Sequence, residues 1–350
     1  MANFTSILTL LADGRPHSVA ELAANVKLNL ETAVGSRKST PIACASFSRP
    51  TVVSRLNALA VSTALQQLRD DGLDIGISKG GEVIWREPVS LLCPVQIGQR
   101  LQSPGREWLL PPEVFYSVDS TSSYLARQPA QSQGRVCLAE MQTSGRGRRG
   151  NQWISPPCHN LYFSIRWQFE CSPALLAGLS LAVGIAVAKV LAPLSEAPVG
   201  IKWPNDLYVD GRKLGGILVE LLSTSASHAD AVIGVGLNIN MPDQGQAIDQ
   251  QWTSLHHHCG EAALPDRNAL AADLLTALRS LFVAFPESGA QFIQSQWSDY
   301  DLAFGQAVTI HSGDEVVRGI GAGIDEAFRF LLRNADNTRS FHSGDVSLRI

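Results

Sequence analysis

Charged residues and cysteines are both scarce in this chain, and each scarcity excludes a class of protein. Only 17% of the 350 residues are charged, against 45% that are hydrophobic, so the chain can bury a large core. A net charge of -4 provides no overall positive field, so any site for an anion has to be local. The six cysteines include no Cys-x-x-Cys pair, which argues against a zinc ribbon or a disulfide framework and favours buried free thiols.

The sequence also offers little evidence for secretion or for a membrane span. Its first residues, MANFTSILTLLADG, lack the basic segment of a signal peptide and reach Asp13 early. Residues 173–194 approach the length of a membrane span, but they are rich in alanine and glycine and carry Ser180, Lys189 and Pro193. We expect this run to be a helix buried inside a soluble domain. We therefore predict a cytoplasmic protein with no membrane partner.

Hydrophobic patterns divide the chain into three predicted domains, at residues 1–90, 91–300 and 301–350. The central one contains a series of strand patterns, at 135–141, 161–167, 199–203, 206–209, 213–221 and 231–239. Asp210-Gly211 predicts a tight hairpin, and successive hairpins imply an antiparallel or mixed sheet, because a doubly wound fold needs a helix between strands. We expect a helix at 266–285 capped by Asp266, and a small β-barrel formed by short strands after Phe304.

Residues 1–90 have the element order of a winged helix. A helix at 4–12 precedes one that begins with a capping box of Ser18 and Glu21, a longer helix at 48–72 follows, and two short strands come last. The third helix would read DNA, with candidate contacts at Arg49, Thr51, Ser54, Arg55 and Asn57. The segment holds nine basic and eight acidic residues, and arginines on a helix are usually a solvated face. Both interpretations of this helix stay open.

The stretch QTSGRGRRGNQW, residues 142–153, contains the G-x-G-x-x-G spacing of dinucleotide-binding loops. That fold requires a helix after the third glycine, and Pro156 and Pro157 prevent one. No G-x-x-x-x-G-K-[ST] phosphate loop occurs in the chain. An anion clamp remains, in which glycines let the backbone approach a ligand and guanidinium groups bind phosphate. Because Arg146, Arg148 and Arg149 repel one another, we expect the loop to be disordered until an anion binds.

Two further stretches carry polar residues in unusual combinations. In GIKWPNDLYVDGRKLGG, residues 200–216, Lys202 and Lys213 bracket two predicted turns, although ordinary hairpin chemistry also explains the turns. In VDSTSSYL, residues 118–125, the Ser-Thr-Ser triplet is either a helix cap or a contact for a polar ligand. The histidines and cysteine at 256–259 are adjacent and cannot all face one ion, so we predict no metal site there or elsewhere in the protein.

Taken together, DSTSSYLAR, QTSGRGRRGNQW, LYFSI, KWPNDLYVDGRKLGGILVE and GVGLNIN resemble the biotin protein ligases, in the same order and with similar separations. With the N-terminal segment, the chain resembles the bacterial bifunctional enzymes that also repress the biotin operon. The likeness covers nearly all of residues 114–350 and is weaker over 1–90. It implies an α+β fold with an N-terminal winged helix-turn-helix, a class II synthetase-like mixed-sheet catalytic domain and a C-terminal SH3-like small β-barrel.

The resemblance also implies a reaction and the residues that perform it. Biotin and ATP, with Mg²⁺, give biotinyl-AMP, and the biotin is then transferred to a lysine of the biotin carboxyl carrier protein of acetyl-CoA carboxylase. Lys213 and Arg148 are the implied catalytic cations. The implied biotin contacts are Ser120, Thr121, Ser122, Gln142, Arg146, Gly147, Arg148, Lys213, Gly216 and Gly234. The implied ATP or adenylate contacts are Arg148, Lys202, Asn205, Asn238 and Trp252, and the tryptophan is equally well explained as core.

Two alternative functions and two possible partners are compatible with the sequence. The same catalytic fold also supports lipoate or octanoate ligases, although a bare alkyl acid does not need the polar Ser-Thr-Ser and Gln142 set. A biotin-sensing DNA-binding protein without ligase activity is the second alternative. The family implies a homodimer when the adenylate is bound and, for its repressors, operator DNA. Here residues 27–47 lengthen the N-terminal segment before the third helix, so repression is less firmly implied than ligation.

Overall fold

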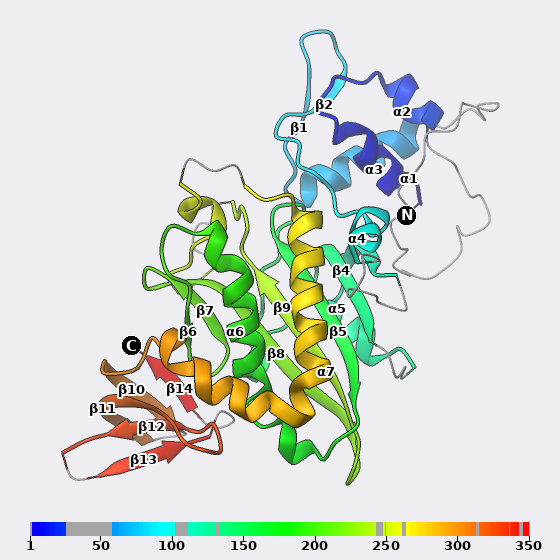
Figure 1. Cartoon of the computed structure of the whole chain (residues 1–350). Coiled ribbons are helices and arrows are strands. Elements are labelled where there is room, and N and C mark those ends of the chain that lie inside the picture. Colours follow the sequence, from blue (N-terminus) through cyan, green and yellow to red (C-terminus); the bar gives the residue numbers. More distant parts are fainter. Residues whose placement is uncertain are drawn as a thin grey trace.

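The computed structural model describes residues 2–25, 58–101, 111–129, 134–242, 248, 250–260, 264–312, 315–335, 337–342 and 346–349. Figure 1 shows a small helical group near the N-terminus, a central sheet covered by helices, and a small sheet near the C-terminus. The predicted DNA contacts Arg49, Thr51, Ser54, Arg55 and Asn57 lie outside the described residues. The structure therefore does not test them.

The N-terminal group packs three helices and a hairpin around one small core. Its elements are α1 (Ala2–Leu11), α2 (Val19–Asn25), α3 (Ala58–Asp70), β1 (Ile75–Ile77) and β2 (Val83–Trp85), with β1 antiparallel to β2. Ser18 Oγ accepts a hydrogen bond from the Glu21 amide at 3.1 Å, which confirms the predicted N-cap of α2. Leu8, Leu22 and Leu68 come from the three helices and are fully buried.

A buried ion pair fastens the segment that leads from this group to the central sheet. Arg267 Nη1 lies 2.8 Å from Glu140 Oε2, and both side chains are buried. Glu140 also accepts a hydrogen bond from the Leu92 amide at 2.6 Å, and Arg267 donates to a backbone carbonyl of the same segment. The Tyr116 hydroxyl donates to Asp71 at 2.9 Å and joins the two groups directly. The N-terminal group is thus held at two separate places.

The central sheet is mixed, as the hairpin pattern predicts. Its strands are β3 (Glu113–Val118), β4 (Arg135–Gln142), β5 (Leu161–Phe169), β6 (Gly200–Lys202), β7 (Asp206–Val209), β8 (Arg212–Thr224) and β9 (Ala229–Leu237). Within the described residues their order is β3-β4-β5-β9-β8-β7-β6, with β3 parallel to β4 and all other neighbours antiparallel. Asp210 and Gly211 both have positive φ, 48° and 71°, which is the conformation of the predicted tight turn between β7 and β8.

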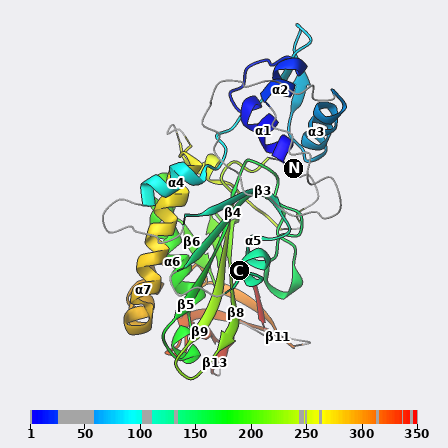
Figure 2. The same ribbon diagram turned by 90° about the vertical axis from the view of Figure 1, so that its right-hand side faces the viewer.

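Helices cover the two faces of this sheet unequally. The long helices α6 (Leu179–Leu191) and α7 (Arg267–Tyr300), with α4 (Pro94–Leu101), lie on one face, and the short α5 (Thr121–Ala126) lies on the other (Figure 2). By length and composition, 173–194 and 267–300 are both apolar enough to cross a membrane, but 61% of the first window is buried inside the fold. α6 packs between the sheet and α7, as expected of a core helix.

Helix α7 is longer than the sequence indicates. Asp266 caps it by accepting from the Asn268 amide at 3.2 Å, as predicted, but the helix passes Pro286 and ends at Tyr300 instead of Phe285. Proline removes one helical hydrogen bond and costs about 3 kcal/mol. Phe282 and Trp297, on either side of it, are buried, and burying two such side chains contributes a comparable amount at about 1.5–3 kcal/mol each. Figure 1 shows that the helix is bent.

A second, smaller sheet follows α7. It consists of β10 (Ala307–Ser312), β11 (Glu315–Ile324), β12 (Phe330–Arg333), β13 (Thr338–Phe341) and β14 (Val346–Arg349) in the antiparallel order β13-β12-β11-β10-β14. The sequence did not predict β13. Trp203 joins this sheet to the central one, because its indole donates to the Phe328 carbonyl at 3.3 Å and its ring lies 5.5 Å from that of Phe330.

The cysteines are mostly as expected. Cys137, Cys158, Cys171 and Cys259 are free and buried, and burial raises the pKa of each thiol. Cys93 is disulfide-bonded, so the expectation of free thiols is wrong at this position. No Cys-x-x-Cys spacing includes Cys93, so no local pattern indicates that it is paired.

Candidate active site

A cavity of about 1170 Å³ lies where the arginine-rich loop, α5, β8 and the start of the second sheet meet. All predicted biotin contacts line it, namely Ser120, Thr121, Ser122, Gln142, Arg146, Gly147, Arg148, Lys213, Gly216 and Gly234. Of the predicted adenylate contacts, Arg148, Lys202 and Asn205 line the cavity as well. The fold therefore brings together motifs that are up to about a hundred residues apart in the chain.

A network of hydroxyl and amide groups forms one end of the cavity. Ser120 caps α5, so the capping interpretation holds, and its hydroxyl lies 3.0 Å from that of Ser122. Gln142 Oε1 accepts from the Thr121 amide at 2.9 Å, which fixes the carboxamide. The Thr121 hydroxyl lies 2.8 Å from that of Ser164, a fully buried residue of β5 that the sequence analysis missed. A serine between the apolar residues Phe163 and Ile165 of a predicted strand was the available signal.

Three glycines allow close packing beside this network. A Cβ at Gly234 would lie 3.3 Å from the Ser164 hydroxyl, and one at Gly236 only 2.6 Å from the Trp153 ring. At Gly216 the nearest atom would also belong to Trp153, at 3.3 Å. The glycines therefore make room for the side chains of Trp153 and Ser164, which line the cavity.

The arginine-rich loop has a defined conformation. Its backbone folds on itself through hydrogen bonds from Gly147 to Asn151 at 2.7 Å and from Trp153 to Gly145 at 2.9 Å. The guanidinium groups have partners, because Arg146 forms an ion pair with Glu220 and Arg148 donates to the Asn205 side chain at 3.1 Å. The expectation that repulsion leaves this loop disordered is therefore not supported by its conformation. Opposite charges and amide oxygens nearby offset the repulsion.

Arg148 and Lys213 place two cations against the cavity. Burial lowers the pKa of Arg148, with Arg149 adding to the effect, but a guanidinium stays protonated under all ordinary conditions. Lys213 Nζ lies 2.9 Å from Asp206 Oδ1 across the β7–β8 hairpin and 5.5 Å from the centre of the Trp153 ring. These contacts hold the ammonium group at the wall, where its side chain is 13% exposed.

A third cation lies farther along the same wall. Lys202 Nζ is 3.3 Å from the Tyr208 hydroxyl and 5.1 Å from the centre of its ring. Burial, followed by the charge of Asp206, raises the pKa of Tyr208 to about 12, so its hydroxyl stays neutral near pH 7. Leu302 and Gln306, which follow α7, complete this end of the cavity. The concentration of positive charge in a protein of net charge -4 makes this wall suited to anions.

Two predicted adenylate contacts do not line the cavity. Asn238 is buried and its side chain donates to the Thr253 carbonyl at 3.0 Å, so it holds the end of β9 against the segment after residue 250. Trp252 is half-buried, and its neighbours Gln250 and Gln251 line the cavity in its place. Trp252 is joined to Lys213 by a backbone bridge, so both residues are next to the cavity wall without lining it. Trp153, Ser164, Asp206, Tyr208, Leu302 and Gln306 line the cavity and were not predicted.

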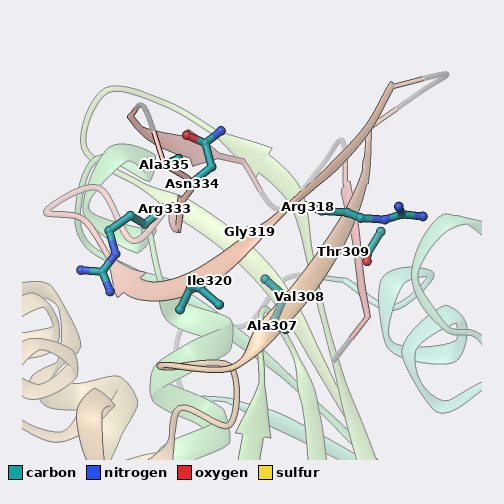
Figure 3. A pocket seen from close by; sticks show the side chains of 9 residues that line it. All are labelled: Ala307, Val308, Thr309, Arg318, Gly319, Ile320, Arg333, Asn334 and Ala335. Atoms are coloured by element: carbon teal, nitrogen blue, oxygen red, sulfur yellow. The ribbon is translucent and has the colours of Figure 1, made fainter.

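Neither the histidine cluster nor a second cavity adds a reactive site. His258 lies 2.8 Å from the Thr253 hydroxyl, and the described residues contain no group of three histidine, cysteine or acidic side chains placed to hold a metal ion. The second cavity is a shallow groove on the small sheet, formed by residues of β10, β11 and β12. Arg318 and Arg333 point away from one another there, so they do not converge on a common ligand (Figure 3).

Comparison with known proteins identifies the family. Residues 114–238 match the Biotin/lipoate A/B protein ligase family, and residues 303–349 match the biotin protein ligase C-terminal domain. The bifunctional ligase/repressor BirA of Escherichia coli K12 is 38% identical over 297 residues, which cover 84% of this chain and 89% of that protein. The chain belongs to the biotin protein ligase family. The sequence-based prediction of an enzyme, a biotin protein ligase, is therefore confirmed.

Other relatives agree with this assignment. The biotin–[acetyl-CoA-carboxylase] ligase of Mycobacterium tuberculosis is 33% identical over 254 residues, which cover 71% of this ligase and 92% of that enzyme. A solved structure of the biotin protein ligase from Aquifex aeolicus in complex with biotin and ATP superimposes with a TM-score of 0.59 and 28% identity, covering 67% of this chain and 97% of that one. The mixed sheet is thus the catalytic-domain fold of biotin ligases.

Proposed function

We propose that this ligase binds biotin and ATP in the 1170 Å³ cavity, forms biotinyl-AMP, and transfers biotin to a lysine of a biotin carboxyl carrier protein. The observation that carries the proposal is the division of the cavity wall. A hydroxyl and amide network lies at one end, and Arg148, Lys213 and Lys202 lie along the rest. The hydroxyl and amide network suits a polar head group, and the three cations suit a carboxylate and phosphates.

Charge is the main obstacle in the first step. An oxygen of the biotin carboxylate attacks the α-phosphorus of ATP, a P–O bond forms, and the bond to the pyrophosphate oxygen breaks. Both reactants are anions, so cations that face the α-phosphate lower the barrier. Lys213, oriented by Asp206, and Arg148, oriented by Asn205, take this role. In the second step the acceptor lysine attacks the acyl carbon and AMP leaves, so no protein nucleophile is needed.

Mg²⁺ fits this site as a partner of the nucleotide. Among the described residues of the wall, Asp206 supplies the one carboxylate, which suits an ion held mainly by substrate phosphates. When bound, the ion offsets the charge on the leaving pyrophosphate. Asp206, whose Oδ1 pairs with Lys213, would hold the ion through its other carboxylate oxygen.

The free edge of β8 supports a homodimer. β7 pairs with β8 only as far as Gly216, so the part of β8 beyond it has no strand on that side in the described chain. Leu221 and Leu222 lie on this part and are 48% and 37% exposed. We propose that two adenylate-bound copies pair here, because an unpaired edge with apolar side chains is a ready surface for strand addition. Sedimentation with and without biotin and ATP tests this, and a monomer under both conditions refutes it.

The N-terminal group is proposed to be a winged helix that binds operator DNA, which would make the ligase a biotin-responsive repressor. The order α1, α2, α3, β1, β2 supports this, as does the name ligase/repressor of the E. coli relative. The small sheet is proposed to be an SH3-like barrel, the central sheet class II synthetase-like, and the location cytoplasmic. Anisotropy with duplex DNA from upstream of biotin-synthesis genes, measured with biotin and ATP, tests repression. Binding no tighter than to scrambled DNA refutes it.

Exchange of label between pyrophosphate and ATP tests the catalytic proposal. We expect exchange that depends on biotin, because adenylate formation is reversible and needs the acid. Octanoate and lipoate are the informative comparisons. Exchange with either of them, and none with biotin, contradicts the substrate assignment while leaving the adenylating chemistry intact. If none of the three acids supports exchange, the enzymatic activity is contradicted. A biotin-sensing DNA-binding protein without ligase activity is then the remaining interpretation.

A further inference from the structure

Arg146 and Arg148 lie two residues apart in the arginine-rich loop, but they contact different surroundings. Arg148 is half-buried and donates to Asn205, which lines the cavity. Arg146 has a side chain that is 45% exposed, and it contacts two residues outside the cavity wall, Glu220 on β8 and Ser123 on α5. The loop is therefore fastened by one contact at the cavity wall and by another to residues outside the wall.

The outer contact has the geometry of a clamp. Arg146 Nη1 donates to Glu220 Oε2 at 3.0 Å, and Nη2 donates to the other carboxylate oxygen, so the guanidinium and the carboxylate pair through two parallel bonds. Nη1 also donates to the Ser123 hydroxyl at 3.3 Å. This paired arrangement is more directional than a single contact with an ammonium group. The Arg146 side chain thus ties the loop to the elements on either side of it.

Glu220 lies outside the cavity, so its contact with Arg146 takes no space that a substrate needs. Glu220 lies on β8, opposite Val232 of β9, beyond the end of β7 and seven residues from Lys213. Its side chain is 26% exposed and does not line the cavity. Biotin, ATP and the adenylate can therefore bind and leave without replacing the ion pair between Arg146 and Glu220. The backbone bonds within the loop hold its shape, whereas this pair holds the loop against the sheet.

We propose that Glu220 is a positioning residue, whose pair with Arg146, here called the latch, keeps the loop over the cavity and slows the escape of biotinyl-AMP before transfer. The inference rests on the proposed function, because it assigns the latch a role in retaining the intermediate. A mixed anhydride that leaves the cavity is lost to water, so retention raises the fraction delivered to the acceptor. Glu220 does not touch the reacting atoms, so the rate of adenylate formation does not depend on it.

The test compares Glu220→Gln with Glu170→Gln. Glutamine keeps the size of each side chain and removes its charge. Glu170 is a matched control, because its side chain is 80% exposed, lies 3.7 Å from His228 and is not part of the cavity. The first readout is the rate at which trypsin cuts the ligand-free protein after Arg146, Arg148 or Arg149, with the fragments assigned by mass. The second is the dissociation rate of biotinyl-AMP from the full-length enzyme.

For Glu220→Gln we expect both rates to rise about fivefold, the most that a half-exposed ion pair usually contributes. Pyrophosphate exchange at saturating biotin stays within about twofold of wild type, and Glu170→Gln matches wild type throughout. Raising the salt concentration reduces the difference in both rates between Glu220→Gln and wild type, because salt screens an exposed ion pair. The double charge reversal, Arg146→Glu with Glu220→Arg, restores slow cleavage after Arg148 and Arg149, the two sites of the loop that it retains.

Two results overturn the proposal. If Glu220→Gln is cut no faster than Glu170→Gln, the latch does not hold the loop. If it is cut faster but releases the adenylate at the wild-type rate, the latch holds the loop without retaining the intermediate. If the wild type forms no biotinyl-AMP, the proposed function fails, while the trypsin comparison still decides whether the latch exists.

Discussion

Replacing Lys213 by methionine tests the electrostatic account of the first step. Methionine keeps an unbranched side chain of similar length and removes the charge. In the structure the ammonium group is held 2.9 Å from Asp206 and its side chain is only 13% exposed, so water screens it weakly. Loss of one preorganised group that stabilises a developing anion costs about 3–4 kcal/mol, or roughly 10²–10³ in rate. We expect biotinyl-AMP formation in a single turnover to slow by that factor.

The same substitution has a smaller effect on stability. Asp206 loses its partner, but its side chain is 21% exposed and can be hydrated, so we expect the free energy of unfolding to fall by about 1–2 kcal/mol. Lys189→Met is the matched control, because Lys189 is exposed on α6 and its Nζ lies 5.2 Å from the centre of the Phe292 ring. A loss of less than about threefold in Lys213→Met, or an equal loss in Lys189→Met, would refute the assignment of Lys213 as the main catalytic cation.

Three further outcomes follow from the geometry. Gly236→Val should drive Trp153 from its position, because even a Cβ would lie 2.6 Å from the ring, and titration should show biotin bound at least about tenfold more weakly. Thr121→Val leaves the Ser164 hydroxyl without its partner and should raise KM for biotin by about tenfold while kcat changes less; an unchanged KM contradicts the network. Although burial lowers the pKa of His17, hydrogen bonds to two carboxylates raise it overall. The stability it contributes is therefore present below about pH 6.5 and lost as the pH rises through the raised pKa, so denaturant midpoints of wild type and His17→Gln should converge as the pH rises from 5.5 to 8.5.

Local chemistry made much of the catalytic domain predictable from the sequence. The Asp210-Gly211 pair adopts positive φ and turns β7 into β8, and Asp266 caps α7. Short apolar runs bounded by turn residues located the strands, and the inner strands β4, β5 and β9 are buried along most of their length. The glycine- and arginine-rich loop and the Lys-Trp-Pro-Asn-Asp segment are short motifs whose residues all lie near one ligand site, so they were found together.

What the sequence could not show depends on contacts between distant segments. Helix α7 continues past Pro286 because one side of its far half, with Ile293 and Trp297, is buried, and burial is a tertiary property. Leu302 joins the cavity wall because its amide donates to the Ile201 carbonyl of β6 at 3.1 Å, a contact between segments about a hundred residues apart. Asn238 was assigned to the adenylate on the strength of its motif, but its amide holds a neighbouring carbonyl behind the wall. A motif predicts which residues belong to a site more reliably than it predicts where each side chain points.

Biotin transfer is the most direct test of the account as a whole. The full-length ligase is incubated with biotin, ATP, Mg²⁺ and a biotin carboxyl carrier domain, and intact mass measures the biotin added to the carrier. We predict one biotin on one lysine, dependent on ATP, with transfer strongly reduced for Lys213→Met and unchanged for Lys189→Met. A carrier that remains unmodified by the wild-type enzyme, or that accepts only octanoate or lipoate, would contradict the central claim.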